Sequence, residues 1–282
     1  MKRNKEAHRS LNKLLVVHKP MHLSSNFFLH KVKRKYKNKK AGFSGTLDPF
    51  ATGCLLVAFG QYARLFKYLN KTPKTYRAVL WLGATSESLD IENITHIGEE
   101  KTLHTEKIKH EIANLVGEIQ YIPPKFSAKK VNGLRAYELA RMGEEVELKE
   151  STMHILNTQF ISYSHPFIVF EATVSEGSYI RSLAQILARR LGVIGTLSHL
   201  HRLREGDFFY DNEKELHPLD YLTIPHNTYC GEKEWIVYGK KIDIDYLSIQ
   251  EDGEYLIVFD DFFSIIQIQN KRVKYLLNKV LI

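Results

Sequence analysis

The stretch at residues 41–53, AGFSGTLDPFATG, constrains this chain more than any other part of its sequence. It holds one carboxylate, Asp48, among three glycines, which adopt backbone angles closed to other residues and let another segment approach closely. Pro49 fixes its own φ and disfavours the α region for Asp48. The stretch therefore predicts a stiff loop that presents a lone acid. The alternative is a surface turn in which Asp48 bonds its own backbone.

A run of cations precedes this loop. Seven of the ten residues at 31–40 are Lys or Arg, and no carboxylate lies among them. Like charges at i,i+4 destabilise a helix by about 0.2–0.5 kcal/mol each, and a polyanion would relieve that repulsion. The alternative is a plain solvated face. We expect RNA to contact this run and the basic stretch at 125–135, through Lys31, Lys33, Arg34, Lys37, Lys129 and Lys130.

The totals favour a nucleic-acid partner. The 282 residues carry a net charge of +8, and a basic balance bears on partners rather than on fold. An anionic membrane surface needs large apolar residues opposite the charges, and the cation run offers only Val32 and Tyr36. No apolar run reaches the roughly 18 residues of a membrane span, and no secretory signal is expected. Cys54 and Cys230 stand far apart without a CxxC motif, which predicts a cytoplasmic protein and no cysteine-based zinc site.

Hydrophobic periodicity predicts alternating strands and helices, with a change of character near residues 225–231. We therefore expect two domains, 1–225 and 226–282. The predicted elements are strands at 14–17, 55–60, 75–83 and 167–175, helices at 24–36, 63–69, 105–116, 137–142 and 178–191, irregular chain at 84–103, a hairpin turn at Asn132-Gly133, and short β runs at 235–238 and 255–259.

Arg181 occupies an unfavourable place in this pattern. It falls in the first turn of the helix that Ser178 is expected to cap, where a cation opposes the helix dipole by roughly 0.3–1 kcal/mol. An anionic partner would offset that cost, so the position predicts a carboxylate or phosphate beside Arg181. The alternative is an exposed arginine that bends away into solvent.

Four segments together resemble the TruB family of tRNA pseudouridine synthases. They are KPMHLSS at 19–25, GFSGTLDPFATG at 42–53, KTYRA at 74–78 and GSYIRSL at 177–183. Their order and spacing are similar to the family from residue 14 to about residue 222. The aspartate loop is the most specific of the four, whereas the lysine-proline segment alone would be weak.

The resemblance implies an enzyme that isomerises uridine 55 (tRNA numbering) in the T-loop of tRNA, by base flipping. It implies that Asp48 is the nucleophile, that Tyr76 stacks on the target uracil and helps to remove the C5 proton, and that Arg181 pairs with the aspartate and keeps it ionised. Apolar and bracing roles in the uracil pocket fall on Leu200, Tyr179 and Lys19. The family uses no cofactor and no metal, and its partner is the T-arm stem-loop. We expect a monomer.

The sequence departs from the family pattern at three places. Phe43 stands where many members carry histidine, so a stacking role in the gap left by the flipped base survives without a polar one. His22 stands where glycine is usual. The segment at 86–93 lacks the usual threonine-aspartate spacing, although Asp90 remains, and no catalytic role is assigned to it.

The fold implied is α+β, a mixed and largely antiparallel sheet flanked by helices with the cleft at its middle. Residues 226–282 are expected to form a shortened PUA-like RNA-binding module or a purely structural β appendage. The histidines lack the paired carboxylates of a metal site, so no metal is expected. Attack by Asp48 on C1′ and attack on C6 both stay open. The rival function is a non-catalytic RNA-folding factor, which would survive loss of Asp48.

Overall fold

The computed structural model describes residues 11–127, 129–131, 134–136, 139, 142, 144 and 148–282. The predicted turn at Asn132-Gly133 lies outside these residues, and so does most of the predicted helix at 137–142. The strands that flank the turn, β8 (Lys130–Val131) and β9 (Leu134–Arg135), pair as the expected hairpin.

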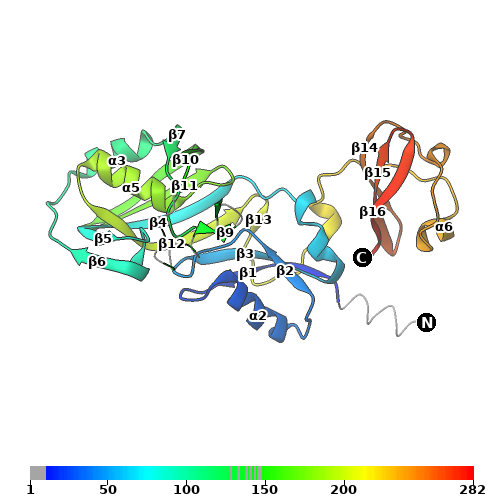
Figure 1. Cartoon of the computed structure of the whole chain (residues 1–282), viewed down its shortest axis with the longest axis horizontal. Coiled ribbons are helices and arrows are strands. Elements are labelled where there is room, and N and C mark those ends of the chain that lie inside the picture. Colours follow the sequence, from blue (N-terminus) through cyan, green and yellow to red (C-terminus); the bar gives the residue numbers. More distant parts are fainter. Residues whose placement is uncertain are drawn as a thin grey trace.

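One large sheet organises the first part of the chain (Figure 1). Its strands run in the order β1-β3-β12-β4-β11-β10-β7, with β2 beside β3 and β13 beside β12. The β12–β3 pair is parallel and the other pairs are antiparallel, which confirms the predicted α+β fold with a mixed, largely antiparallel sheet. The strands are β1 (Lys13–Lys19), β2 (Ala41–Ser44), β3 (Thr52–Phe59), β4 (Lys74–Leu82), β7 (Gly117–Tyr121), β10 (Ser151–Ser164), β11 (Phe167–Val174), β12 (Gly195–Glu205) and β13 (Phe208–Phe209).

Among the described residues, helices α2 (Ser25–Lys35), α3 (Thr105–Ala113) and α5 (Ile180–Leu191) cover this sheet (Figure 1). α2 begins after Ser24, whose side chain accepts a hydrogen bond from the Phe27 amide, and buries an apolar stripe against β1 and β3. α3 and α5 pack with β4, β10 and β11 around the largest core cluster. α5 ends at Gly192 in the left-handed conformation, as predicted. Its N-cap is Tyr179 rather than the expected Ser178, whose hydroxyl instead meets that of Ser175 at 3.3 Å.

Two sequence expectations for the connecting segments are wrong. The predicted helix at 63–69 is instead two 3₁₀ turns, η1 (Gly60–Arg64) and η2 (Phe66–Tyr68). Its buried side chains Tyr62, Leu65 and Tyr68 recur every third residue, the period of a 3₁₀ helix. The segment at 84–103 contains η3 (Ile91–Asn93) and a hairpin of β5 (Ala84–Ser86) and β6 (Ile94–Ile97). Ala84 and Ser86 are buried and Thr85 is exposed, the alternation of a half-buried strand.

The last part of the chain forms a small antiparallel sheet of β14 (Gly253–Val258), β15 (Phe262–Gln269) and β16 (Arg272–Leu281). One of its faces packs on η1 and η2, and the other is covered by residues from the 229–249 segment, which carries α6 (Lys233–Val237) and η5 (Ile244–Tyr246). The predicted β run at 235–238 is therefore wrong, because a short apolar run fits a buried helical turn equally well. Another 3₁₀ turn, η4 (Pro218–Asp220), precedes this part.

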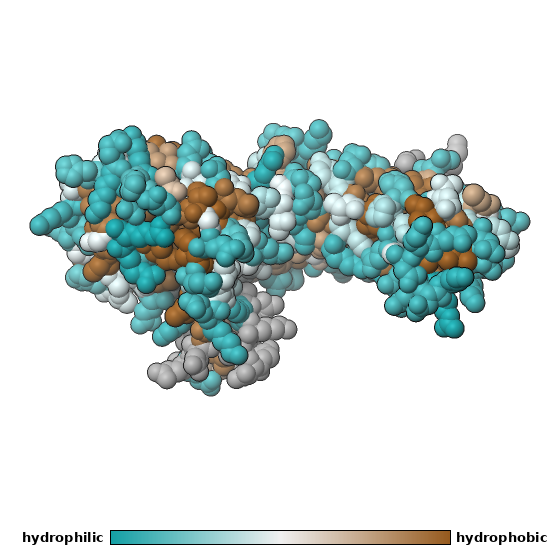
Figure 2. All heavy atoms as spheres, turned by 90° about the horizontal axis from the view of Figure 1, so that it is seen from above, coloured by the Kyte–Doolittle hydropathy of each residue, from teal (hydrophilic) through white to brown (hydrophobic). Residues whose placement is uncertain are grey.

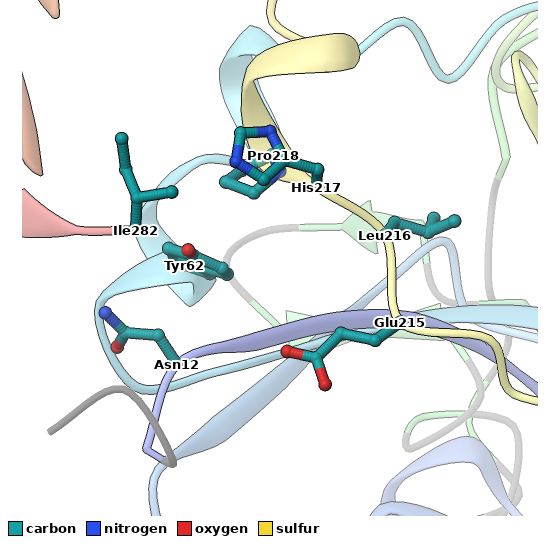
Figure 3. A pocket seen from close by; sticks show the side chains of 7 residues that line it. All are labelled: Asn12, Tyr62, Glu215, Leu216, His217, Pro218 and Ile282. Carbon is teal, nitrogen blue, oxygen red and sulfur yellow. The ribbon is translucent and has the colours of Figure 1, made fainter. Parts of the chain in front are cut away.

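The two parts appear as a larger and a smaller lobe, with hydrophilic side chains over most of the face seen in Figure 2. A hollow of about 290 Å³ lies at their junction (Figure 3). It is lined by Asn12, Tyr62, Glu215, Leu216, His217, Pro218 and Ile282. Asn12 closes one side, because its Nδ2 donates to the Leu281 carbonyl at 3.1 Å.

Two further expectations bear on where the protein works. Cys54 is buried, Cys230 is exposed, and both are free thiols. In the part of the chain that the structure describes, no helix is long and apolar enough to cross a membrane.

Candidate active site

The loop that carries Asp48 leaves the sheet on β2 and returns on β3, two strands that pair with each other. Leu47, Phe50 and Ala51 anchor the loop in the largest core cluster, with exposed fractions of 3%, 0% and 0%. The Asp48 side chain between them is 33% exposed. Because its neighbours are locked in the core, the loop holds a reachable carboxylate in a fixed place.

Arg181 faces that carboxylate from the first turn of α5. Its Nη2 lies 2.9 Å from Asp48 Oδ2, and its Nη1 lies 3.2 Å from Asp90 Oδ2. The same nitrogens donate to the carbonyls of Ser88, at 2.7 Å, and Phe126, at 2.8 Å. The guanidinium is 3% exposed, and its Nε finds no acceptor among the described residues. The anionic partner that its position predicts is thus present twice, as two carboxylates.

Asp90 is the member of this group that the sequence analysis left without a role. Its side chain is 2% exposed and accepts from the Ser88 hydroxyl at 2.6 Å and from the Glu92 amide at 2.9 Å. Burial raises the pKa of Asp90, while the Ser88 and Glu92 bonds and the Arg181 charge act against that rise. The first-turn position of Arg181 calls for an anion, but nothing in the sequence places residue 90 beside it.

Tyr76 and Leu200 come together on adjacent strands. Leu200 is the register partner of Ala78, and Tyr76 belongs with Leu200 to the core cluster that also holds the Asp48 loop anchors. Tyr76 is 9% exposed and Leu200 is 5% exposed. Tyr179 packs against the same cluster, with its ring centroid 6.3 Å from that of Tyr121. The pocket residues implied by the resemblance therefore share one apolar wall.

Lys19 braces the loop from its other side. The side chain is fully buried, and Nζ donates to the carbonyls of Pro20, Leu23 and Pro49 at 2.9, 2.6 and 3.2 Å. Those three bonds use the three protons of an ammonium group. Burial lowers the pKa of Lys19 to about 8, and the nearby Asp48 charge opposes the shift.

His22 adopts left-handed backbone angles, which glycine takes without strain. Its φ is 64°, in the left-handed region that costs an L-residue about 1–2 kcal/mol. The His22 amide donates to the Pro49 carbonyl at 2.8 Å, so the residue ties the lysine-proline turn to the Asp48 loop.

Arg202 is a second buried arginine that bonds the loop, and no sequence signal pointed to it. Arg202 and Glu205 are each 1% exposed and lie 3.3 Å apart. Arg202 Nε donates to the Cys54 carbonyl at 2.9 Å, and Nη2 donates to the Gly45 carbonyl at 2.8 Å. The Ser44 hydroxyl donates to Glu205 Oε1 at 3.0 Å. The Arg202–Glu205 pair therefore bonds both ends of the loop. Nothing in the sequence pattern predicted that these two charged residues would be buried.

The predicted RNA contacts are spread over separate surfaces. Lys31, Arg34 and Lys37 on and after α2 are exposed, and Lys33 is partly exposed. Lys35 contradicts the expectation of an unpaired run, because it forms an ion pair with Glu213 at 2.6 Å.

The other predicted contacts lie elsewhere. Lys129 Nζ donates to the Ser151 hydroxyl at 2.6 Å, and Lys130 begins β8. Phe43, on β2, packs partly buried against the cluster beneath α2. In the ranges that the structure describes, no three His, Cys, Asp or Glu side chains are placed to hold a metal ion.

Comparison with known proteins confirms the resemblance drawn from the motifs. The sequence model of the TruB family pseudouridylate synthase (N terminal domain) matches residues 33–180. The tRNA pseudouridine synthase B of Sulfurovum sp. (strain NBC37-1) is 55% identical over 270 residues, which cover 96% of this chain and 98% of that protein. That of Campylobacter jejuni (strain RM1221) is 50% identical over 96% of this chain and 99% of that protein.

A solved structure supports the fold. The crystal structure of a Cbf5-Nop10-Gar1 complex contains a chain that superposes with a TM-score of 0.66, over 99% of this chain and 87% of that one. The two sequences are 18% identical, so this likeness concerns the fold alone.

Proposed function

The chain belongs to the TruB family of pseudouridylate synthases, and from this premise we propose that it converts uridine 55 in the T-loop of tRNA to pseudouridine. The observation that carries the proposal is the 2.9 Å pair of Arg181 with Asp48, a carboxylate that stays 33% exposed on a locked loop. The relatives named tRNA pseudouridine synthase B support the choice of tRNA as substrate.

The proposed reaction breaks the N1–C1′ bond, rotates the uracil, and forms a C5–C1′ bond, with the C5 proton lost in exchange for a proton on N1. Asp48 acts as the nucleophile and must be ionised. Arg181 holds the carboxylate in place, because its guanidinium lies 2.9 Å from Asp48 Oδ2 and donates charge-assisted bonds. Attack at C1′ and attack at C6 both fit a carboxylate in this position.

The target base leaves its stack to reach the acid, at a cost of a few kcal/mol. Stacking on an aromatic side chain returns roughly 1–3 kcal/mol per base. We assign that stacking to Tyr76, whose hydroxyl also serves the removal of the C5 proton. Leu200 and Tyr179 supply the apolar wall, Lys19 braces the loop, and Phe43 fills the gap that the flipped base leaves.

The T-arm stem-loop is proposed to cross the exposed cations at α2 and the 125–135 hairpin. The enzyme would act as a monomer in the cytoplasm, where its two free thiols stay reduced. We also propose the division into domains 1–225 and 226–282. The second carries a core cluster of its own, with Ile236, Tyr255 and Ile266 among its members, which supports the division and fits a PUA-like module or a structural β appendage equally well.

Exchange of the nucleophile tests the proposed function. Asp48→Asn keeps the shape of the side chain but removes its negative charge, so the variant should form no pseudouridine and still bind the T-arm. Tritium release from C5-labelled uridine in a T-arm hairpin measures the reaction, and filter binding measures affinity. A fully active Asp48→Asn variant would overturn the mechanism. A wild type that binds and refolds tRNA without releasing tritium would instead identify an RNA-folding factor.

A further inference from the structure

Arg202 is a buried cation that the proposed chemistry leaves without a role beyond the loop. It lies on β12 as the register partner of Tyr76 on β4, in an antiparallel pair. Side chains of such partners stand on the same face of the sheet with their Cβ atoms about 4.5–5.5 Å apart. The Tyr76 and Arg202 side chains therefore lie side by side, and the Arg202 charge acts on the Tyr76 hydroxyl.

The guanidinium is fixed in place. Its partners are the Cys54 carbonyl at 2.9 Å, the Gly45 carbonyl at 2.8 Å and Glu205 at 3.3 Å. The first two acceptors are backbone carbonyls, which cannot rotate away as a side chain can. The third, the Glu205 side chain, is 1% exposed. A planar guanidinium bonded in several directions cannot rotate freely, so the N–H groups that it presents beside Tyr76 keep a fixed direction.

Glu205 is restrained in turn. It accepts from the Ser44 hydroxyl at 3.0 Å, and Lys74 Nζ lies 3.8 Å away. Lys74 stands two residues before Tyr76, and Ser44 stands four residues before Asp48. One buried charge cluster therefore bonds the strand of the aromatic and the loop of the nucleophile.

This arrangement bears on the Tyr76 hydroxyl. A tyrosine oxygen beside a guanidinium can accept from its N–H groups and keep its own proton for another direction. Burial raises the pKa of Tyr76, and the Arg202 charge acts against that rise. A neutral, oriented hydroxyl on the wall of the pocket is a group that can take part in proton movement at the base.

We propose that Arg202 is a positioning residue for the reaction, which orients the Tyr76 hydroxyl toward the bound base, and that Glu205 holds Arg202 in that place. The inference rests on the proposed isomerisation of uridine. Arg202 does not contact the substrate, and its effect passes through Tyr76.

A double-mutant cycle on the full chain tests this. Arg202→Lys and Tyr76→Phe are made singly and together, and kcat and KM are measured by tritium release from the T-arm hairpin. Arg202→Lys should lower kcat by about tenfold or more with little change in KM, because a misplaced group costs rate rather than binding. In the Tyr76→Phe background the same change should cost less than about twofold, the limit of additivity for independent sites.

Arg77→Lys is the matched control. Arg77 neighbours Tyr76 on β4 but points to the opposite face, where it pairs with Glu171 at 2.6 Å with 49% of its side chain exposed. The control should leave kcat unchanged. Equal losses from Arg202→Lys with and without the Tyr76 hydroxyl would overturn the proposal and reduce Arg202 to a structural role.

A second variant covers a failure to fold. If Arg202→Lys is unfolded by circular dichroism, Glu205→Gln is measured in the same two backgrounds. It keeps one acceptor oxygen, which can serve Ser44, and replaces the carboxylate oxygen that faces Arg202 with an uncharged amide NH2. A kcat loss confined to the Tyr76 background supports the proposal, whereas an equal loss in both, or none, overturns it. An inactive wild type would contradict the proposed function itself, which separates the two failures.

Discussion

Two buried arginines approach the Asp48 loop from different sides, and their surroundings differ. Arg181 pairs with the buried Asp90, but it also pairs with Asp48, which is 33% exposed, and it keeps one nitrogen without an acceptor among the described residues. Arg202 pairs with a carboxylate that is 1% exposed and bonds two backbone carbonyls of the loop and its strand. The first arrangement keeps a charge within reach of a substrate, and the second keeps a backbone in shape.

The difference predicts how each side fails. Removing one partner of a fully buried pair leaves an uncompensated charge, at about 3–5 kcal/mol. Beside Arg181, the exposed Asp48 carboxylate can be solvated by water or contacted by substrate when its partner is lost. A substitution there should therefore disturb the geometry of the site more than the stability of the fold. Substitutions near Arg181 should therefore cost rate, and substitutions near Arg202 should cost folding free energy as well.

Among the substitutions that probe this contrast, the largest effect is expected from Arg181→Lys. Lysine keeps the charge, but its one nitrogen cannot serve Asp48, Asp90 and two carbonyls together. We expect kcat to fall by about 10² or more, as for loss of a preorganised donor, while the melting temperature falls only slightly, because the lysine charge still faces the buried Asp90. Single-turnover tritium release and thermal denaturation measure the two.

Arg190→Lys on the same helix is the control, since Arg190 donates to the Asn114 carbonyl away from the site. An Arg181→Lys variant that is fully active, or one that melts far below wild type, would break the contrast between the open and the enclosed side.

Gly53→Ala tests the enclosed side. Gly53 has a φ of 108°, and a Cβ there would lie 2.2 Å from the Arg202 carbonyl oxygen, which belongs to paired backbone and cannot yield cheaply. We expect the free energy of unfolding to fall by about 1–3 kcal/mol or more, measured by urea denaturation.

Gly192→Ala is the matched comparison, because Gly192 has a φ of 75° with open space around it and carries backbone strain alone. Equal losses from the two variants would show that the chain around Arg202 relaxes more readily than its burial implies.

The exposed cations form a third class, which neither arginine network uses. Replacing Lys33, Arg34 and Lys37 by Ala should reduce the slope of log affinity against log salt by up to about 0.9 per lost phosphate contact for duplex-like RNA. Lys35→Ala, whose cation already pairs with Glu213, should change the slope less. Filter binding to the T-arm across salt concentrations measures both. An unchanged slope in the triple variant would show that these side chains face solvent and do not contact RNA.

The smallest effect concerns Lys19, which supports the loop without an ion pair of its own. Burial lowers its pKa from 10.5 to about 8, so between these values the unfolded chain binds the proton that the folded chain releases. This group's contribution to stability therefore rises with pH across that window. Wild type should gain unfolding free energy relative to Lys19→Met as the pH rises from 8 to 10. A difference that does not vary with pH would place the Lys19 pKa elsewhere.

Helices and strands with a regular hydrophobic pattern could be predicted from the sequence, whereas those with an interrupted pattern could not. The strands at 14–17, 55–60, 75–83 and 167–175, and the helices at α2 and α5, appear close to their predicted bounds. β10 and β12 received no prediction, and each contains two register shifts that interrupt the alternation of buried and exposed side chains.

The site divides in the same way. The glycines around Asp48 and the first-turn position of Arg181 are local signals, and both pointed to a fixed acid and an anion partner. Asp90 lies 91 positions from Arg181, and Arg202 meets its loop partner Gly45 across 157 positions. Such pairings depend on strand order, which hydrophobic patterns alone do not specify.

The burial of strand β3 determines whether the protein or the RNA must move for the reaction. All eight residues of β3 are buried, and the strand is paired on both sides. Its amide protons should exchange with solvent only through global unfolding, among the slowest in the chain. The nucleophile stands four residues before this strand and therefore travels with the least mobile element of the fold. Bringing base and acid together then falls to the RNA, so the flexibility of the T-loop, rather than that of the protein, should set how fast the base is presented.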